Sequence, residues 1–126
     1  MGIILLQLPL TILTSNNNMP TNHLSIPKAA ELLKQSGNLF TEVFKHGTLS
    51  VEFYTPDKTD TQTPHNRDEV YIIATGTGQF YNDGLTTNFK PGDFLFVPAG
   101  VEHRFLDFTD DFSTWVLFYG PVGGEK

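Results

Sequence analysis

Turn residues divide this chain into about eight short apolar or alternating segments, and that spacing constrains the fold more than any other feature. The 126 residues include 11 Gly and 8 Pro spread along the chain, which is typical of many turns and short strands. One helix is expected near the start, and the remaining segments fit an antiparallel sandwich or barrel. A chain of this length is expected to form one domain that folds without disulfide bonds.

The expected helix covers the segment K-A-A-E-L-L-K-Q-S-G, which follows Ser25-Ile26-Pro27. Ser25 is a suitable N-cap, Pro27 is tolerated in a first turn, and Gly37 can end the helix in the left-handed conformation. A tight turn is expected at Asn82-Asp83-Gly84, because these residue types favour the backbone of a two-residue hairpin. We predict strands over residues 39–45, 48–54, 69–75, 79–82, 85–88, 94–97, 102–107 and 113–119, with a polar loop over 55–64.

Charge and cysteine content exclude several classes of function. The chain has no cysteine, so thiolate metal sites, disulfides and cysteine nucleophiles are excluded. Its net charge of -6, with a pI of about 5.0, argues against a surface for nucleic acid or an anionic membrane. Neither a G-x-S-x-G elbow nor a phosphate-binding or dinucleotide-binding glycine motif occurs in the sequence.

An apolar run over residues 2–14 is the one unusual feature of the composition. Pro9 interrupts it, and it is too short to span a bilayer. Without a basic start and a small-residue cleavage site it does not resemble a signal peptide, so we expect a cytoplasmic protein. We interpret residues 1–24 as an apolar arm and linker, and residues 25–126 as the domain. The arm would add a strand to a sheet of this subunit or a partner, or pack irregularly. Met19, after a polar run, is a candidate for the natural start.

Two stretches bring together the residue types of a metal site. Residues 60–76 read D-T-Q-T-P-H-N-R-D-E-V-Y-I-I-A-T-G, in which His65 and Glu69 flank a polar turn before an apolar strand. Residues 91–105 read P-G-D-F-L-F-V-P-A-G-V-E-H-R-F and supply His103. A carboxylate on a strand that enters the core needs a cation, a hydrogen-bond cluster or a raised pKa. Two imidazoles and one carboxylate suit Fe, Mn, Ni, Zn or Cu, and affinity alone does not choose among them.

Strand alternation extends the candidate site. If Glu69 points inward, Tyr71 and Ile73 do so too, and Phe105 follows His103 in the same way. These three residues are predicted to line the pocket or to pack in the core, with a pocket hydroxyl as an alternative role for Tyr71. Four further aromatic residues are expected in the core or pocket, namely Phe94, Phe96, Trp115 and Phe118.

Both stretches resemble the two sequence motifs of the cupins. In the second motif, Gly92, Pro98, Gly100 and His103 have the cupin spacing, and Asp107 stands where the motif has asparagine. The first motif retains His65, Glu69 and Gly76 at matching intervals, whereas Thr63 and Asp57 replace its first histidine and first glycine. The resemblance covers roughly residues 48–120. Within the family, the chain is similar to the small single-domain bacterial members.

This resemblance implies an all-β fold, a double-stranded β-helix or jelly-roll barrel, with a metal ion inside one end. It implies that His65, Glu69 and His103 are ligands of a divalent metal ion. Gln62, in a loop that Pro64 keeps out of regular strand geometry, is either a fourth ligand or lies outside the coordination sphere. Cupins are commonly homodimers, so a homodimer is expected.

The resemblance leaves several functions open, because cupins host many unrelated ones. The first is a metal-dependent enzyme, dioxygenase-like or isomerase-like, that acts on a small organic molecule. The second is a non-catalytic cupin that binds or senses a small ligand. The third is a scaffold whose metal site is vestigial, a reading that the loss of the first motif histidine at Thr63 favours.

Overall fold

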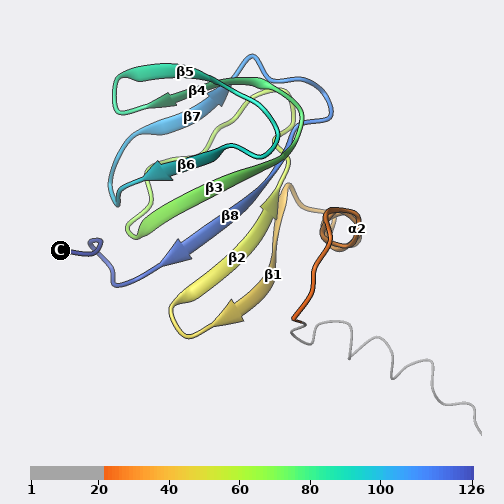
Figure 1. Cartoon of the computed structure of the whole chain (residues 1–126), viewed down its shortest axis with the longest axis horizontal. Helices are drawn as coiled ribbons and strands as arrows, with labels where there is room; N and C mark the ends of the chain where they lie inside the picture. The colour runs from red at the N-terminus through yellow and green to blue at the C-terminus, as the bar shows by residue number, and fades with distance from the viewer. Residues whose placement is uncertain (1–21) are drawn as a thin grey trace, which may run out of the picture.

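The computed structural model describes residues 22–126, in which two facing β-sheets form most of the domain (Figure 1). Helix α2 (Ile26–Ser36) comes first and eight strands follow it. The strands are β1 (Phe40–His46), β2 (Leu49–Tyr54), β3 (Asp68–Thr75), β4 (Gly78–Asn82), β5 (Leu85–Phe89), β6 (Phe94–Val97), β7 (His103–Leu106) and β8 (Ser113–Tyr119).

The larger sheet has the strand order β1-β2-β8-β3-β6, and the smaller sheet has the order β5-β4-β7. All paired strands are antiparallel. Consecutive strands β6, β7 and β8 alternate between the two sheets, as expected for a jelly-roll. The predicted all-β barrel with one short helix is therefore confirmed. Within residues 22–126, no helix is long and apolar enough to cross a membrane.

Local sequence signals define both ends of α2. The Ser25 hydroxyl accepts a hydrogen bond of 3.1 Å from the backbone N–H of Lys28, as an N-cap should. Gly37 ends the helix with a φ of 72°. The buried face of the helix, Ala29 and Leu33, forms a cluster with residues on the outer face of the larger sheet, namely Phe53, Ala74, Val43 and Trp115.

Two turns require unusual backbone conformations. Asp83 and Gly84 connect β4 to β5 with φ values of 51° and 91°, which confirms the predicted tight turn. Gly76, the glycine that ends the first motif, has a φ of 84° after β3. A Cβ atom there would lie 2.6 Å from the Cα of Phe112, so only glycine fits this crossing between the sheets.

The main hydrophobic core lies between the two sheets. Its buried members come from both sheets and include the aromatic pair Tyr71 and Phe105, whose ring centroids lie 4.8 Å apart. The complete cluster consists of Tyr71, Ile73, Phe80, Phe89, Val97, Phe105, Phe112 and Val116. Because packed aromatic side chains fill the centre, a ligand site is confined to the end of the barrel.

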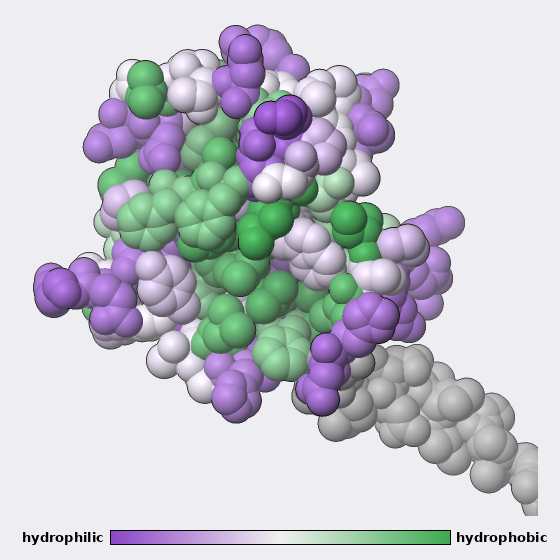
Figure 2. Space-filling view, viewed as in Figure 1, coloured by the Kyte–Doolittle hydropathy of each residue, from purple (hydrophilic) through white to green (hydrophobic). Residues whose placement is uncertain are grey.

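The prediction for two of the aromatic residues was wrong. Phe94 and Phe96 are 65% and 44% exposed, and Figure 2 shows apolar side chains gathered over β6 on this face. The alternate residues of β6 point inward instead: Leu95 packs against the core and Val97 is buried within it. The sequence F-L-F-V is apolar throughout, so its composition does not reveal which face is buried.

One sequence prediction concerns residues outside the described part of the chain. The apolar run over residues 2–14 and its expected strand or arm lie there. The division between residues 24 and 25 and the expected homodimer also remain predictions.

Candidate metal centre

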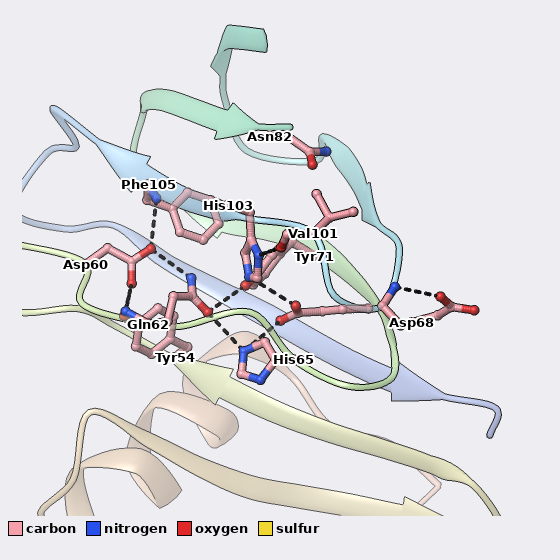
Figure 3. Close-up of polar contacts among 12 residues, drawn as sticks. Tyr54, Asp60, Gln62, His65, Asp68, Tyr71, Asn82, Val101, His103 and Phe105 are labelled. Atoms are coloured by element: carbon pink, nitrogen blue, oxygen red, sulfur yellow. Dashed lines mark hydrogen bonds and ion pairs between the residues drawn. The ribbon is translucent and has the colours of Figure 1, made fainter. Parts of the chain in front are cut away.

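His65, Glu69 and His103 converge at one end of the barrel, between the two sheets. One ligating atom from each residue lies within 4.8 Å of those of the other two. His65 belongs to the loop before β3, Glu69 is the second residue of β3, and His103 is the first residue of β7. Figure 3 shows the two imidazoles on facing segments that are far apart in the sequence. The structure thus brings together the three residues that the motifs pick out.

The imidazole of His103 has a defined orientation. Its Nδ1 lies 2.8 Å from the carbonyl oxygen of Val101, to which it must donate a proton. In the neutral ring the lone pair then resides on Nε2, which lies 3.2 Å from Oε1 of Glu69. A nitrogen lone pair facing a carboxylate oxygen at this distance is unfavourable unless a proton or a metal ion lies between them.

The carboxylate of Glu69 is buried without hydrogen bonds. The residue is 1% exposed, and neither of its oxygens has a hydrogen-bond partner among the described residues, nor does Nε2 of His103. Oε2 of Glu69 lies 3.9 Å from Nε2 of His65. Buried polar atoms are normally paired, so three such atoms converging on one point fit a cation between them.

The pKa of His103 responds to this arrangement. Burial by itself lowers the pKa of the imidazole, but the contact with Glu69 and the Val101 carbonyl raise it. The negative charges of Glu69 and Asp60 act in the same direction, and the net result is a raised pKa. The site therefore attracts positive charge, whether a proton or a metal ion.

The turn between β6 and β7 holds the His65 loop in place. The N–H of Gly100 donates a 2.6 Å hydrogen bond to the carbonyl of His65. The N–H of Ala99 donates to Oδ1 of Asp68 at 3.0 Å, and that of Glu125 donates to Oδ2 at 2.8 Å. Alternation along the strand predicts that Asp68 points away from the site, as Figure 3 shows, but the side chain is 6% exposed rather than on the surface, because the segments of Ala99 and Glu125 cover it. The second motif therefore positions the first through its Pro98–Gly100 turn.

Gln62 lies next to the three converging residues. Its Oε1 accepts a 2.9 Å hydrogen bond from the Tyr71 hydroxyl and lies 3.4 Å from Nε2 of His65 (Figure 3). Its Nε2 donates to Oδ2 of Asp60 at 2.8 Å. Because a carboxylate can only accept, this contact fixes which end of the amide faces the site. The carbonyl oxygen of Gln62 therefore points toward the histidines.

Asp60 is a residue to which sequence reasoning gave no role. It is 7% exposed and also accepts hydrogen bonds from the Tyr54 hydroxyl at 2.7 Å and the N–H of Phe105 at 2.8 Å. The N–H of Gln62 donates to it at 3.2 Å. Burial and the bond to Asp60 raise the pKa of Tyr54, so this hydroxyl remains a donor. Asp60 thus joins the Gln62 loop to β2 and β7.

The remaining residues singled out in the sequence lie around this centre. Tyr71, Ile73 and Phe105 are buried in the core cluster, and of these the Tyr71 hydroxyl reaches the site through Gln62. Thr63, which stands in place of the first motif histidine, is exposed. The structure thus places Gln62, rather than Thr63, beside the converging histidines.

A cavity of about 430 Å³ adjoins Glu69, one of the three converging residues, and the neighbouring Gln62. Glu69 and Gln62 form part of its wall, so a molecule in the cavity would lie next to the metal centre. The volume is in the range of cavities that bind small organic molecules.

Comparison with known proteins agrees with this fold. A family model described as Cupin domain matches residues 50–117, which include all of the converging residues. The chain is a cupin. An uncharacterized protein of Streptomyces coelicolor is 33% identical over 84 residues, which span 65% of this chain and 80% of that protein.

Solved structures show the same fold at low sequence identity. A cupin superfamily protein from Desulfitobacterium hafniense is similar with a TM-score of 0.61 and 18% identity, over 82% of this cupin and 96% of that chain. A putative mannose-6-phosphate isomerase from Ralstonia eutropha is similar with a TM-score of 0.54 and 20% identity, over 65% and 83% of the two chains. At these identities the likeness concerns the fold alone.

Proposed function

We propose that this cupin is a metal-dependent enzyme that acts on a small organic molecule. The observation that carries the proposal is the pair of acceptors, Nε2 of His103 and Oε1 of Glu69, buried 3.2 Å apart without hydrogen bonds. His65, Glu69 and His103 would hold a divalent ion of Fe, Mn, Ni, Zn or Cu, all of which accept nitrogen and carboxylate ligands. Such an ion supplies Lewis-acid or oxygen chemistry when bound.

Gln62 is proposed as the fourth protein ligand. Its carbonyl oxygen points toward the histidines, and its amide nitrogen is held by Asp60. An amide oxygen is a neutral donor, so the fourth position adds no charge to the two imidazoles and one carboxylate. This ligand takes the place of the motif histidine that Thr63 replaces.

The adjoining cavity supports an enzyme rather than a closed structural site. Structural metal sites are enclosed by protein ligands, whereas catalytic sites keep positions open for water or substrate. Here the side chain of His65 is 35% exposed, and Glu69 and Gln62 line the cavity. A molecule bound in the cavity would therefore lie beside Glu69 and Gln62, while the packed core below excludes water from the opposite side.

Dioxygenation and isomerisation both fit this arrangement, and oxygen consumption separates them. The full chain, loaded in turn with Fe(II), Mn(II) and Zn(II), would be assayed against diketones, catechols and flavonols for oxygen uptake. Proton exchange in D₂O would be followed by NMR on the same compounds. We expect metal-dependent turnover of at least one compound, absent after chelation.

The outcome of this screen discriminates among the functions. Turnover with oxygen uptake supports the dioxygenase branch, and exchange or rearrangement without uptake supports the isomerase branch. If metal binds but no compound is turned over, the enzyme proposal is contradicted in favour of a ligand-binding cupin. The exposed Thr63 at the first histidine position is the observation that favours that alternative.

A further inference from the structure

The cavity beside the metal centre has an apolar rim. Leu39 and Phe40, which are 48% and 54% exposed, line it together with Val116 of β8. Exposed aromatic and aliphatic side chains at the edge of a cavity are available to cover the apolar part of a bound molecule.

Glu52 provides a second carboxylate on the cavity wall. It pairs with Val116 on β8, which in turn pairs with Tyr71 on β3. Residues directly opposite one another in a sheet share a face, so Glu52 points inward like Tyr71. Within residues 22–126, its side chain makes no hydrogen bond or ion pair with another side chain. A polar group without a protein partner faces the space that a ligand would fill.

The environment of Glu52 is already negative. Burial, together with the negative charges of Glu69 and Glu42, raises the pKa of Glu52 to about 7. Such a carboxyl is stabilised by a hydrogen-bond donor or a positive charge, and it is destabilised by another anion.

The charges around the cavity do not favour an anionic ligand. No lysine or arginine is among the described residues that line it. A divalent ion would contribute two positive charges, whereas Glu52, Glu69 and the buried Asp60 behind Gln62 contribute up to three negative charges. A phosphate or carboxylate group would therefore meet no balancing side chain once the ion is bound.

We infer that the cavity binds a small uncharged or cationic molecule, with its apolar part against Leu39, Phe40 and Val116 and a hydrogen-bond donor on Glu52. This inference rests on the proposed function, because it concerns the ligand of the same site. It predicts that organic acids and phosphorylated compounds bind weakly, including compounds of the class named for the Ralstonia protein.

A matched set of probes tests this charge preference. Benzylamine, benzyl alcohol and benzoate share a ring and differ in charge. Each would be titrated by NMR into the zinc-loaded full chain at about pH 8, above the pKa of about 7 of Glu52. We expect benzylamine and benzyl alcohol to shift the signals of the cavity residues and to bind about tenfold more tightly than benzoate. The Glu52→Gln variant should lose about tenfold in benzylamine affinity.

Glu42→Gln is the control, because it removes the same charge from the paired position on β1. Glu42 is exposed, and its carboxylate is hydrogen-bonded to Ser50 rather than lining the cavity. Benzylamine affinity should change less than twofold in this variant, since exposed charges are screened. Glu52→Lys should reverse the preference in favour of benzoate.

Three outcomes would overturn the inference: tighter binding of benzoate to the natural chain, an unchanged preference in Glu52→Gln, or no shift with any probe at millimolar concentration. Binding is measured without turnover, and metal content is measured in each sample. A protein without catalytic activity can therefore still uphold the inference, and an active enzyme can still refute it.

Discussion

Replacing Glu69 with glutamine is expected to abolish metal binding and, in the same variant, to raise the thermal stability of the metal-free protein. The carboxylate is 1% exposed and has no hydrogen-bond partner among the described residues. Above the raised pKa of His103, where no proton lies between the two side chains, its burial costs stability that a bound cation returns. An amide of the same shape keeps the packing, removes the charge, and can donate a hydrogen bond to Nε2 of His103.

We expect the metal affinity of Glu69→Gln to fall by more than about 100-fold, since even residues that only support metal ligands contribute about 10- to 100-fold. The free energy of unfolding without metal should rise by about 1–2 kcal/mol, or several degrees in melting temperature. Calorimetric metal titration and thermal unfolding in a chelator measure the two effects.

Glu102→Gln is the control for this pair of measurements. Glu102 is adjacent to His103, but its side chain is 57% exposed and forms an ion pair with Arg104 on the surface. Its loss should change stability by less than about 0.5 kcal/mol and leave metal affinity unaltered. Retained metal affinity in Glu69→Gln, or a lower melting temperature without metal, would contradict the account of this carboxylate.

Replacing Asp60 with asparagine is expected to destabilise the fold and to weaken metal binding, although Asp60 is not one of the proposed ligands. Asp60 accepts hydrogen bonds from four donors, on Tyr54, on Phe105 and twice on Gln62. The amide of asparagine would place its own N–H groups against at least one of these donors. Leaving buried donors unpaired in this way costs about 2–4 kcal/mol.

The same substitution releases the amide of Gln62, so its carbonyl oxygen would no longer be held toward the histidines. We expect metal affinity to fall about 10- to 100-fold, as for other residues that orient metal ligands. Denaturant unfolding and metal titration measure both effects in one preparation.

Two variants separate the roles of Asp60. Tyr54→Phe removes one of the hydrogen bonds that Asp60 accepts, so stability should fall by about 1 kcal/mol while metal affinity is retained. Gln62→Ala should reproduce the loss of metal affinity with a smaller loss of stability. Unchanged metal affinity in Asp60→Asn would show that Asp60 supports only the fold and does not orient Gln62.

Local signals in the sequence predicted much of the fold. Ser25 and Gly37 mark the ends of α2, and Asp83-Gly84 marks the β4–β5 turn. These signals are readable in the sequence because a helix cap or a tight turn depends only on residues a few positions apart. The three converging residues were also predictable, since motif spacing fixes positions on strands. The motif spacing does not predict the orientation of the His103 imidazole, because that orientation depends on a hydrogen bond to the carbonyl of Val101.

The unpredicted features depend on contacts between distant segments. Asp60 lies in a polar loop that reads as exposed, and it is buried because Tyr54 and Phe105 approach it from two different strands. Glu52 is an acidic residue on an alternating strand, a pattern that usually indicates a solvated face. Its place on the cavity wall follows from the pairing of β2 with β8, which sets Glu52 opposite Val116 on the same face of the sheet.

The metal content of the protein tests the central claim, that His65, Glu69 and His103 hold a divalent ion. The full chain and Glu69→Gln would be produced and purified without added metals or metal-affinity resin, and their metals measured by mass spectrometry. The account predicts about one divalent ion per natural chain and less than about one tenth of that in the variant. A natural chain that carries no more metal than Glu69→Gln, and takes up none when titrated, would contradict it.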